Sequence, residues 1–227
     1  MKYPYLLFDA DDTLFDFQAA SSRAFAVMCR MNDIPNTPEV YQLYHEINAV
    51  LWRAFDRGEV SKDYVTRERY LRFLSALELK RDPDQCNLDY LTALGETVFP
   101  LPHAEEVCRR LANQGHQLYI ITNAVASVQR SRLKHCSFGD LFQYAFISEE
   151  AGASKPDPAY YQYVRTRLPE ITPENTLIIG DSLTTDIKGA NNAGLPCCWF
   201  NPNRLPAPPD LAIDHEIHDL RDLLKLV

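Results

Sequence analysis

The sequence predicts an α/β fold in which a doubly wound parallel sheet is interrupted, near its start, by an α-helical insert. Five short apolar runs do not alternate between apolar and polar residues, which is typical of strands covered on both faces. Helical patterns separate the later runs, and the interval 17–98 contains helical patterns alone. This order of elements indicates at least five parallel strands joined by right-handed crossovers.

The strands and helices of the sheet domain follow from these apolar runs. We predict the strands at 5–8, 118–121, 144–147, 176–179 and 197–200. Three helices beside these strands have apolar residues three or four positions apart, and they end near Gly115, Pro169 and Gly194. Glycine and proline are frequent just past the ends of helices, so these residues mark the expected boundaries.

The interval 17–98 is expected to fold as a domain of four helices inserted into the sheet domain, which comprises residues 1–16 and 99–227. Apolar residues recur at helical spacing in two series: Val40, Leu43, Tyr44, Ile47 and Leu51, then Tyr70, Phe73, Leu74 and Leu77. Thr37-Pro38 and Asp82-Pro83 each place a capping residue before a proline suited to the first helical position. Because the insert follows the first strand directly, we expect it at the carboxyl edge of the sheet, where such folds bind ligands.

Composition and charge exclude several classes of protein. The 227 residues are 46% hydrophobic and carry a net charge of −8 without a basic run, so nucleic-acid binding is not expected. The apolar runs are far shorter than the roughly 20 residues of a membrane-spanning helix. The six cysteines are scattered through a chain too large to need disulfides, which favours the reducing cytoplasm. We expect a cytoplasmic monomer or small homo-oligomer.

Polar residues follow four of the predicted strands. They are Asp9-Ala10-Asp11-Asp12-Thr13, Thr122-Asn123, Lys155-Pro156 and Gly180-Asp181-Ser182. Because the carboxyl ends of parallel strands share one edge of a sheet, we expect these side chains to converge. Clustered carboxylates repel one another, so a hard cation is expected among them. Mg²⁺ is the expected ion, because it binds to a small number of protein ligands when a phosphate completes its coordination shell.

The same cluster predicts phosphoryl chemistry. Lys155 supplies a fixed positive charge, and Thr122 with the backbone N–H groups after it supplies neutral donors. Asp9 is the candidate nucleophile, forming an aspartyl-phosphate. Asp11 is the candidate general acid and base, which protonates the leaving group and then deprotonates water.

These motifs, in this order, resemble the four motifs of the haloacid dehalogenase superfamily. The resemblance implies a Rossmann-like core with strand order 5-4-1-2-3 and a helical type 1 cap domain. It implies that Asp9, the Asp11 carbonyl and Asp181 bind the metal, and that Thr122, Asn123 and Lys155 bind phosphate. Asp186 either orients the metal's surroundings through water or merely begins a helix. The second aspartate of Asp9-x-Asp11 argues against carbon–halogen cleavage, since the true dehalogenases lack it.

A narrower similarity extends over nearly the whole chain. Residues 8–15, 51–60 and 147–152 are similar to those of the YjjG-like noncanonical pyrimidine 5′-nucleotidases. This similarity implies a small phosphorylated metabolite, a nucleoside 5′-monophosphate, as the substrate. Phe17, Trp52 and Phe55 are candidates for stacking on its base, although aromatic residues at helical spacing are more often part of a core. A sugar-phosphate or phosphoglycolate phosphatase and a non-catalytic binding or regulatory module are the alternatives.

Overall fold

The computed structural model describes residues 2–227, which form two compact units. One unit contains the chain up to Phe17 and from Val98 to Val227, and the other is Gln18–Thr97. The first unit holds the sheet and the second is helical. The chain therefore leaves the sheet unit once and returns to it once.

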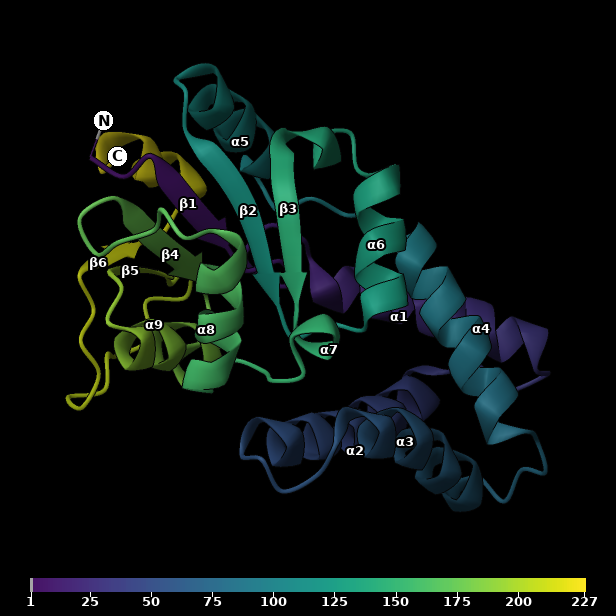
Figure 1. The fold of residues 1–227 in the computed structure, drawn as a ribbon. Coiled ribbons are helices and arrows are strands. Elements are labelled where there is room, and N and C mark those ends of the chain that lie inside the picture. The colour runs from purple at the N-terminus through teal and green to yellow at the C-terminus, as the bar shows by residue number, and fades with distance from the viewer. Residues whose placement is uncertain (1) are drawn as a thin grey trace. The chain divides into compact units, whose positions relative to one another are not determined.

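The sheet has six parallel strands among the described residues (Figure 1). They are β1 (Tyr5–Phe8), β2 (Gln117–Thr122), β3 (Phe142–Ile147), β4 (Thr176–Gly180), β5 (Cys197–Phe200) and β6 (His215–Ile217). Their spatial order is β3-β2-β1-β4-β5-β6. The predicted fold class and the predicted order of the first five strands are confirmed, and β6 adds an unpredicted strand beside β5.

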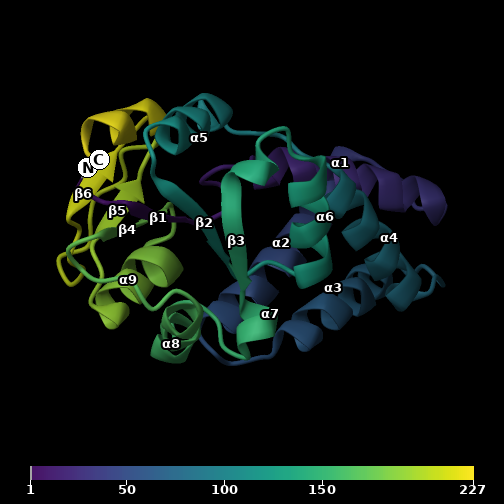
Figure 2. The same ribbon diagram turned by 45° about the horizontal axis from the view of Figure 1, so that its top comes forward.

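Helices cover both faces of the sheet, as the non-alternating strands require (Figures 1 and 2). Leu6 and Phe8 of β1 pack on one face with residues of α5 (Ala104–Asn113) and of the C-terminal turns η3 (Leu220–Lys225). Leu7 points to the other face, which packs against α8 (Pro158–Arg167) and α9 (Lys188–Ala193). Successive residues of one strand thus belong to two separate cores.

Shorter elements complete the sheet unit. Strand β2 is followed by α6 (Ala126–His135) and the turn η1 (Gly139–Leu141), strand β3 by α7 (Ser148–Ala151), and strand β4 by the helical turn η2 (Leu183–Ile187). The turn η1 leads directly into the amino end of β3, whereas α6, α7 and η2 begin near the carboxyl end of a strand. These three elements therefore supply side chains at the edge of the sheet where ligands bind in this type of fold.

The helical unit is built from α1 (Phe17–Met31), α2 (Pro38–Asp56), α3 (Lys62–Ala76) and α4 (Pro83–Glu96). Thr37 and Asp82 cap α2 and α4 as expected: Thr37 Oγ1 accepts from Val40 N at 3.4 Å, and Asp82 Oδ1 accepts from Asp84 N at 2.9 Å. The core of the unit is aromatic, with buried rings in mutual contact from Phe25, Tyr44, Tyr70, Phe73 and Tyr90.

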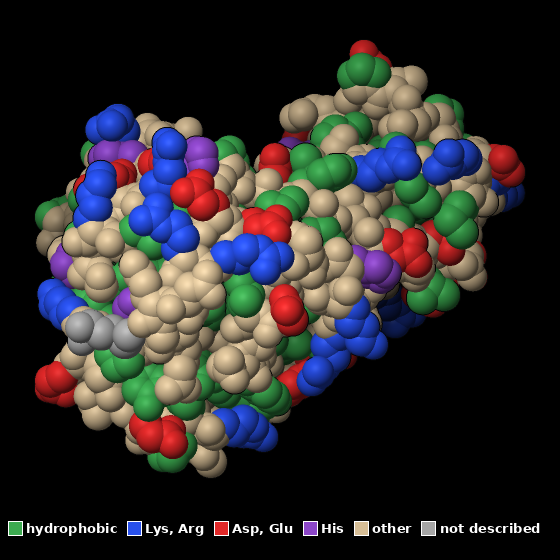
Figure 3. All heavy atoms as spheres, turned by 90° about the horizontal axis from the view of Figure 1, so that it is seen from above, with side chains coloured by type: hydrophobic (Ala, Val, Ile, Leu, Met, Phe, Trp, Pro, Cys, Tyr) green, Lys and Arg blue, Asp and Glu red, His purple; other side chains and the backbone are tan. Residues whose placement is uncertain are grey.

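Surface charge is mixed on the face drawn in Figure 3, where Lys and Arg side chains lie among Asp and Glu side chains. Such a distribution offers no continuous basic track on that face for a phosphate backbone to follow. Within residues 2–227, every helix is too short or too polar to cross a bilayer.

Candidate active site

Asp9 and Asp181 lie side by side because of the strand register. Phe8 at the end of β1 pairs with Ile179 near the end of β4, and Asp9 N donates to Ile179 O at 2.8 Å. Asp9 directly follows β1, and Asp181 directly follows β4. The strand order reverses direction between β1 and β4, so this pair occupies the switch point where open parallel sheets bind ligands.

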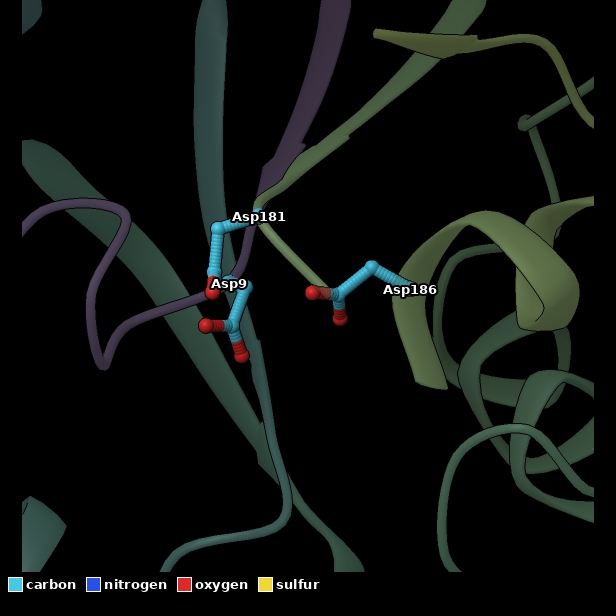
Figure 4. A group of neighbouring side chains, drawn as sticks. All are labelled: Asp9, Asp181 and Asp186. Carbon is cyan, nitrogen blue, oxygen red and sulfur yellow. The ribbon is translucent and has the colours of Figure 1, made fainter. Parts of the chain in front are cut away.

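Asp186 joins this pair from η2. One side-chain oxygen each from Asp9, Asp181 and Asp186 lies within 4.8 Å of the other two. Figure 4 shows the three side chains converging from the ends of two strands and from the short helical turn. A Cβ atom on Gly180 would lie 2.4 Å from Asp186 Cγ, so only glycine leaves room for this approach.

Lys155 provides a buried positive charge within the cluster. Its Nζ donates to Asp9 Oδ1 at 2.5 Å, to Asp186 Oδ1 at 2.6 Å and to the carbonyl oxygen of Ile121 at 3.0 Å. An ammonium group has three N–H donors, so these contacts use all of them. Lys155 is therefore fixed in position, as is the Asp9 oxygen that it contacts.

The electrostatics of the cluster favour a further cation. Burial raises the pKa of Asp9 well above its ordinary value, and Asp186 and Asp181 raise it further, while Lys155 opposes the shift. Burial and the charge of Asp186 raise the pKa of Asp181 to about 7. Burial alone lowers the pKa of Lys155, but Asp186 and Asp9 more than offset it, so that pKa is raised. Three carboxylates thus lie close together, and one ammonium group pairs with two of them.

Two residues that were not predicted from the sequence hold Asp181. Thr13 Oγ1 donates to Asp181 Oδ1 at 3.1 Å and accepts from Asp181 N at 3.1 Å. Trp199 on β5 donates its indole N–H to Asp181 O at 2.9 Å. Both residues are buried. Thr13 stands in the first motif, so its position was a usable signal, whereas an apolar strand gave no signal for Trp199.

Asp11 lies in a tight turn after β1 and faces a different cation. Asp12 adopts a left-handed backbone conformation with a φ of 58°, and its N–H donates to Phe15 O at 2.7 Å. The Asp11 carboxylate accepts a hydrogen bond from Arg132 of α6. Arg132 was not predicted from the sequence either, since a charged residue in a polar helix is expected at the surface.

Thr122 and Asn123 are both engaged at the end of β2. Thr122 N donates to the hydroxyl of Tyr160 at 3.1 Å, and Thr122 Oγ1 accepts from Ala124 N at 3.0 Å. The Asn123 side-chain amide makes two 2.9 Å hydrogen bonds with the backbone N–H and carbonyl of Lys155. Asn123 therefore fixes the backbone that carries the buried lysine.

The three predicted specificity residues lie at the start of α1 and in α2. Phe17 is the first residue of α1, and its N–H donates to Asp12 Oδ1 at 3.1 Å. Trp52 and Phe55 of α2 are half-buried and contact each other, with ring centroids 5.4 Å apart. A base-stacking role for these side chains stays a prediction.

The donor set suits a hard divalent ion such as Mg²⁺. Carboxylate oxygens are the ligands that Mg²⁺ prefers, and it binds to one or two carboxylates together with substrate phosphate. Asp9 and Asp181 offer such oxygens next to each other. The mutual repulsion of the carboxylates would be relieved by such an ion.

The fold and this cluster define a class: a doubly wound α/β protein with an acidic centre at the switch point of its sheet. Residues 3–194 match the model of the haloacid dehalogenase-like hydrolases, and the chain belongs to this family. The resemblance predicted from the motifs is thereby confirmed.

Three relatives align with nearly the whole chain. YfnB of Bacillus subtilis, described as a HAD-hydrolase, is 38% identical over 100% of this chain and 96% of its own. PynA of Streptococcus pneumoniae is 31% identical over 99% of this chain and 94% of its own. YjjG of Escherichia coli is 29% identical over 100% of this chain and 99% of its own. Both are named pyrimidine 5′-nucleotidases. A crystal structure of YfnB bound to magnesium matches with a TM-score of 0.92 and covers 100% of this chain and 99% of that one.

Proposed function

We propose that this protein is a Mg²⁺-dependent phosphomonoester hydrolase that acts through an aspartyl-phosphate on Asp9. The observation that carries the proposal is the buried contact between Asp9 Oδ1 and Lys155 Nζ at 2.5 Å, beside Asp181 and Asp186. A fixed ammonium group favours the ionised carboxylate and attracts a phosphate dianion to the same place. This combination of nucleophile and positive charge suits phosphoryl transfer.

The reaction follows from the contacts of Asp9 and Asp11. Because Lys155 holds Asp9 Oδ1, we assign the attack on phosphorus to Oδ2; its bond to phosphorus forms as the ester P–O bond breaks. Asp11 protonates the departing alkoxide. Asp11 then takes a proton from water, which attacks phosphorus, breaks the bond to Asp9 and releases inorganic phosphate.

The acidic residues also have two further roles, in metal binding and in orienting Lys155. The side chains of Asp9 and Asp181 and the carbonyl of Asp11 would hold Mg²⁺, which when bound neutralises the carboxylates and the phosphate oxygens. Asp186 accepts from Lys155 Nζ through Oδ1 and from Ser182 N through Oδ2, at 2.6 and 3.1 Å. Asp186 thus acts by orienting Lys155.

Phosphate binding is assigned to Lys155, Thr122 and Asn123, with Lys155 contributing its positive charge because its three N–H donors are already engaged. Thr122 Oγ1 accepts from Ala124 N, so its own hydroxyl proton is the one offered to a phosphate oxygen. The side chain of Asn123 holds the backbone of Lys155, so we assign its direct contact with phosphate to its backbone N–H.

The substrate that we propose is a pyrimidine nucleoside 5′-monophosphate. Two relatives that match over nearly their whole length carry the name pyrimidine 5′-nucleotidase. We assign the choice of substrate to the helical unit acting as a cap domain, with Trp52 and Phe55 as the candidate contacts to the base. Aromatic rings stack on nucleobases with about 1–3 kcal/mol per base.

A panel of phosphorylated metabolites tests the proposed function. We expect Mg²⁺-dependent release of phosphate, with the highest kcat/KM for pyrimidine nucleoside 5′-monophosphates. A preference for sugar phosphates or phosphoglycolate would refute the substrate but retain the chemistry. No release from any compound, p-nitrophenyl phosphate included, would favour a non-catalytic module.

The role of Asp9 has its own test. Asp9→Asn should lower kcat by about 10⁴-fold or more while leaving the circular dichroism spectrum unchanged. Asp210→Asn makes the same substitution at an exposed residue and should keep full activity. Appreciable turnover by Asp9→Asn would remove Asp9 as the nucleophile.

A further inference from the structure

Helix α6 carries two polar side chains that are almost completely excluded from solvent. Gln129 and Arg132 are 0% and 1% exposed and lie one helical turn apart. Within residues 2–227, the Arg132 Nε and both polar atoms of the Gln129 amide have no hydrogen-bond partner. Burying a guanidinium is costly unless a strong partner offsets it, so what Arg132 contacts needs an explanation.

Arg132 contacts both ends of the turn that follows β1. Its Nη1 donates to Asp11 Oδ1, and its guanidinium lies over the ring of Phe15, 5.6 Å from the ring centroid. The ring of Phe15 also packs on Phe138, with centroids 5.9 Å apart. Asp11 and Phe15 are joined by a backbone bridge, so one buried side chain fixes the turn from two sides.

Asp11 depends more on such a partner than Asp9 or Asp186, because its side chain is less enclosed by the protein. Its side chain is 27% exposed, whereas that of Asp9 is 11% exposed and that of Asp186 is 1% exposed. A partly exposed aspartate without an anchor samples several side-chain rotamers. A charge-assisted hydrogen bond from an immobile guanidinium selects one of them.

We propose that Arg132 is a positioning residue for proton transfer, which holds the Asp11 carboxyl in the orientation that delivers a proton to the leaving oxygen. The inference rests on the proposed function. The hydrogen bond goes to Oδ1, so Oδ2 is the oxygen that carries the proton. The contact with the Phe15 ring holds the guanidinium at a second point beside Asp11.

The leaving group separates this role from a merely structural one. An alkoxide, as in a nucleoside 5′-monophosphate, needs a proton as it departs, whereas p-nitrophenolate leaves without one. We expect Arg132→Met to lower kcat/KM for the alkyl ester at least about tenfold more than for p-nitrophenyl phosphate, part of the roughly 10²–10⁴-fold that a positioned general acid contributes. Asp11→Asn should show the same dependence on the substrate.

Two further variants serve as controls. Arg130→Met replaces an exposed arginine two residues away, which pairs with Glu150, and should leave both kcat/KM values unchanged. Arg132→Lys keeps the charge and should restore part of the kcat/KM for the alkyl ester relative to that for p-nitrophenyl phosphate. It also provides the measurement if Arg132→Met does not fold. Isothermal titration calorimetry should show Mg²⁺ binding by Arg132→Met that is no weaker than that by wild type, because Arg132 hydrogen-bonds to the carboxylate of Asp11, whereas the proposed metal ligand is the Asp11 backbone carbonyl.

The outcomes distinguish the inference from the function beneath it. If wild type hydrolyses neither ester, the proposed function fails. If wild type hydrolyses both esters and the Arg132 variants lose activity equally on both, or bind Mg²⁺ more weakly, Arg132 is a structural anchor and the inference is wrong.

Discussion

Replacing Lys155 by methionine tests whether electrostatics hold the acidic cluster together. Methionine has similar length but offers no donor, so the substitution removes the hydrogen bonds to Asp9, Asp186 and the Ile121 carbonyl at 2.5, 2.6 and 3.0 Å. Two carboxylates would then face each other in a buried site without their shared cation. Removing one partner of a buried ion pair costs about 3–5 kcal/mol.

The expected loss converts into a measurable change in melting temperature. For a domain of this size, 1 kcal/mol shifts Tm by about 2–4 °C, so Lys155→Met should lower Tm by roughly 6 to 20 °C without Mg²⁺. The protein has two tryptophans, Trp52 in the helical unit and the buried Trp199 on β5. In a Trp52→Phe background, fluorescence therefore reports the unfolding of the sheet unit alone.

A second substitution identifies the cause of the loss. Asp186→Asn removes one of the stranded charges and supplies an amide donor, so Lys155→Met/Asp186→Asn should be about 1–3 kcal/mol more stable than Lys155→Met. The same Asp186→Asn change in the wild-type chain should destabilise, since Lys155 then loses a charged partner. A loss below about 1 kcal/mol in Lys155→Met, or losses that simply add in the double variant, would refute the electrostatic reasoning.

Three other predictions concern the metal, the glycine beside it and the helical unit. Asp181→Asn should weaken Mg²⁺ binding about tenfold or more in isothermal titration calorimetry, and an unchanged affinity would contradict its assignment as a ligand. Gly180→Ala places a methyl group 2.4 Å from Asp186 Cγ, so it should lower the free energy of unfolding by about 1–3 kcal/mol and should also lower activity. Wild-type stability and wild-type activity in this variant would mean that Asp186 moves freely. Trp52→Ala should change the ratio of kcat/KM between nucleotides and sugar phosphates, whereas a lower Tm with an unchanged ratio would assign Trp52 to the core of its unit.

Much of the fold could be predicted because its signals are local. Each of the five predicted strands contains a short apolar run, visible within four to six residues of sequence. Four of these strands are buried along most of their length, whereas Gln143 and Tyr144 of the edge strand β3 are exposed. Strand β6 was missed because His215–Ile217 has three residues, two of them polar. Its place depends on pairing with β5, which no local pattern records.

The meeting of Asp9 and Asp181 could also be predicted, since residues that follow parallel strands share one edge of the sheet. The convergence of Lys155 on the same edge was predicted for the same reason, but its individual contacts were not: that its Nζ bridges Asp9 and Asp186 depends on side-chain packing. Arg132, which reaches Asp11 across 121 positions of sequence, was not predicted at all. Its pairing does not follow from the spacing of residues along the chain.

The sequence by itself determined the strands, the helical interval and the set of acidic residues at the strand ends, because periodicity and residue type act over a few positions. The tertiary structure alone decided that Asn123 holds the backbone of Lys155, that Gly180 admits Asp186 and that a buried arginine faces Asp11. These contacts depend on how distant elements pack, and a charged side chain in a helix becomes buried only when a neighbour offers it a partner.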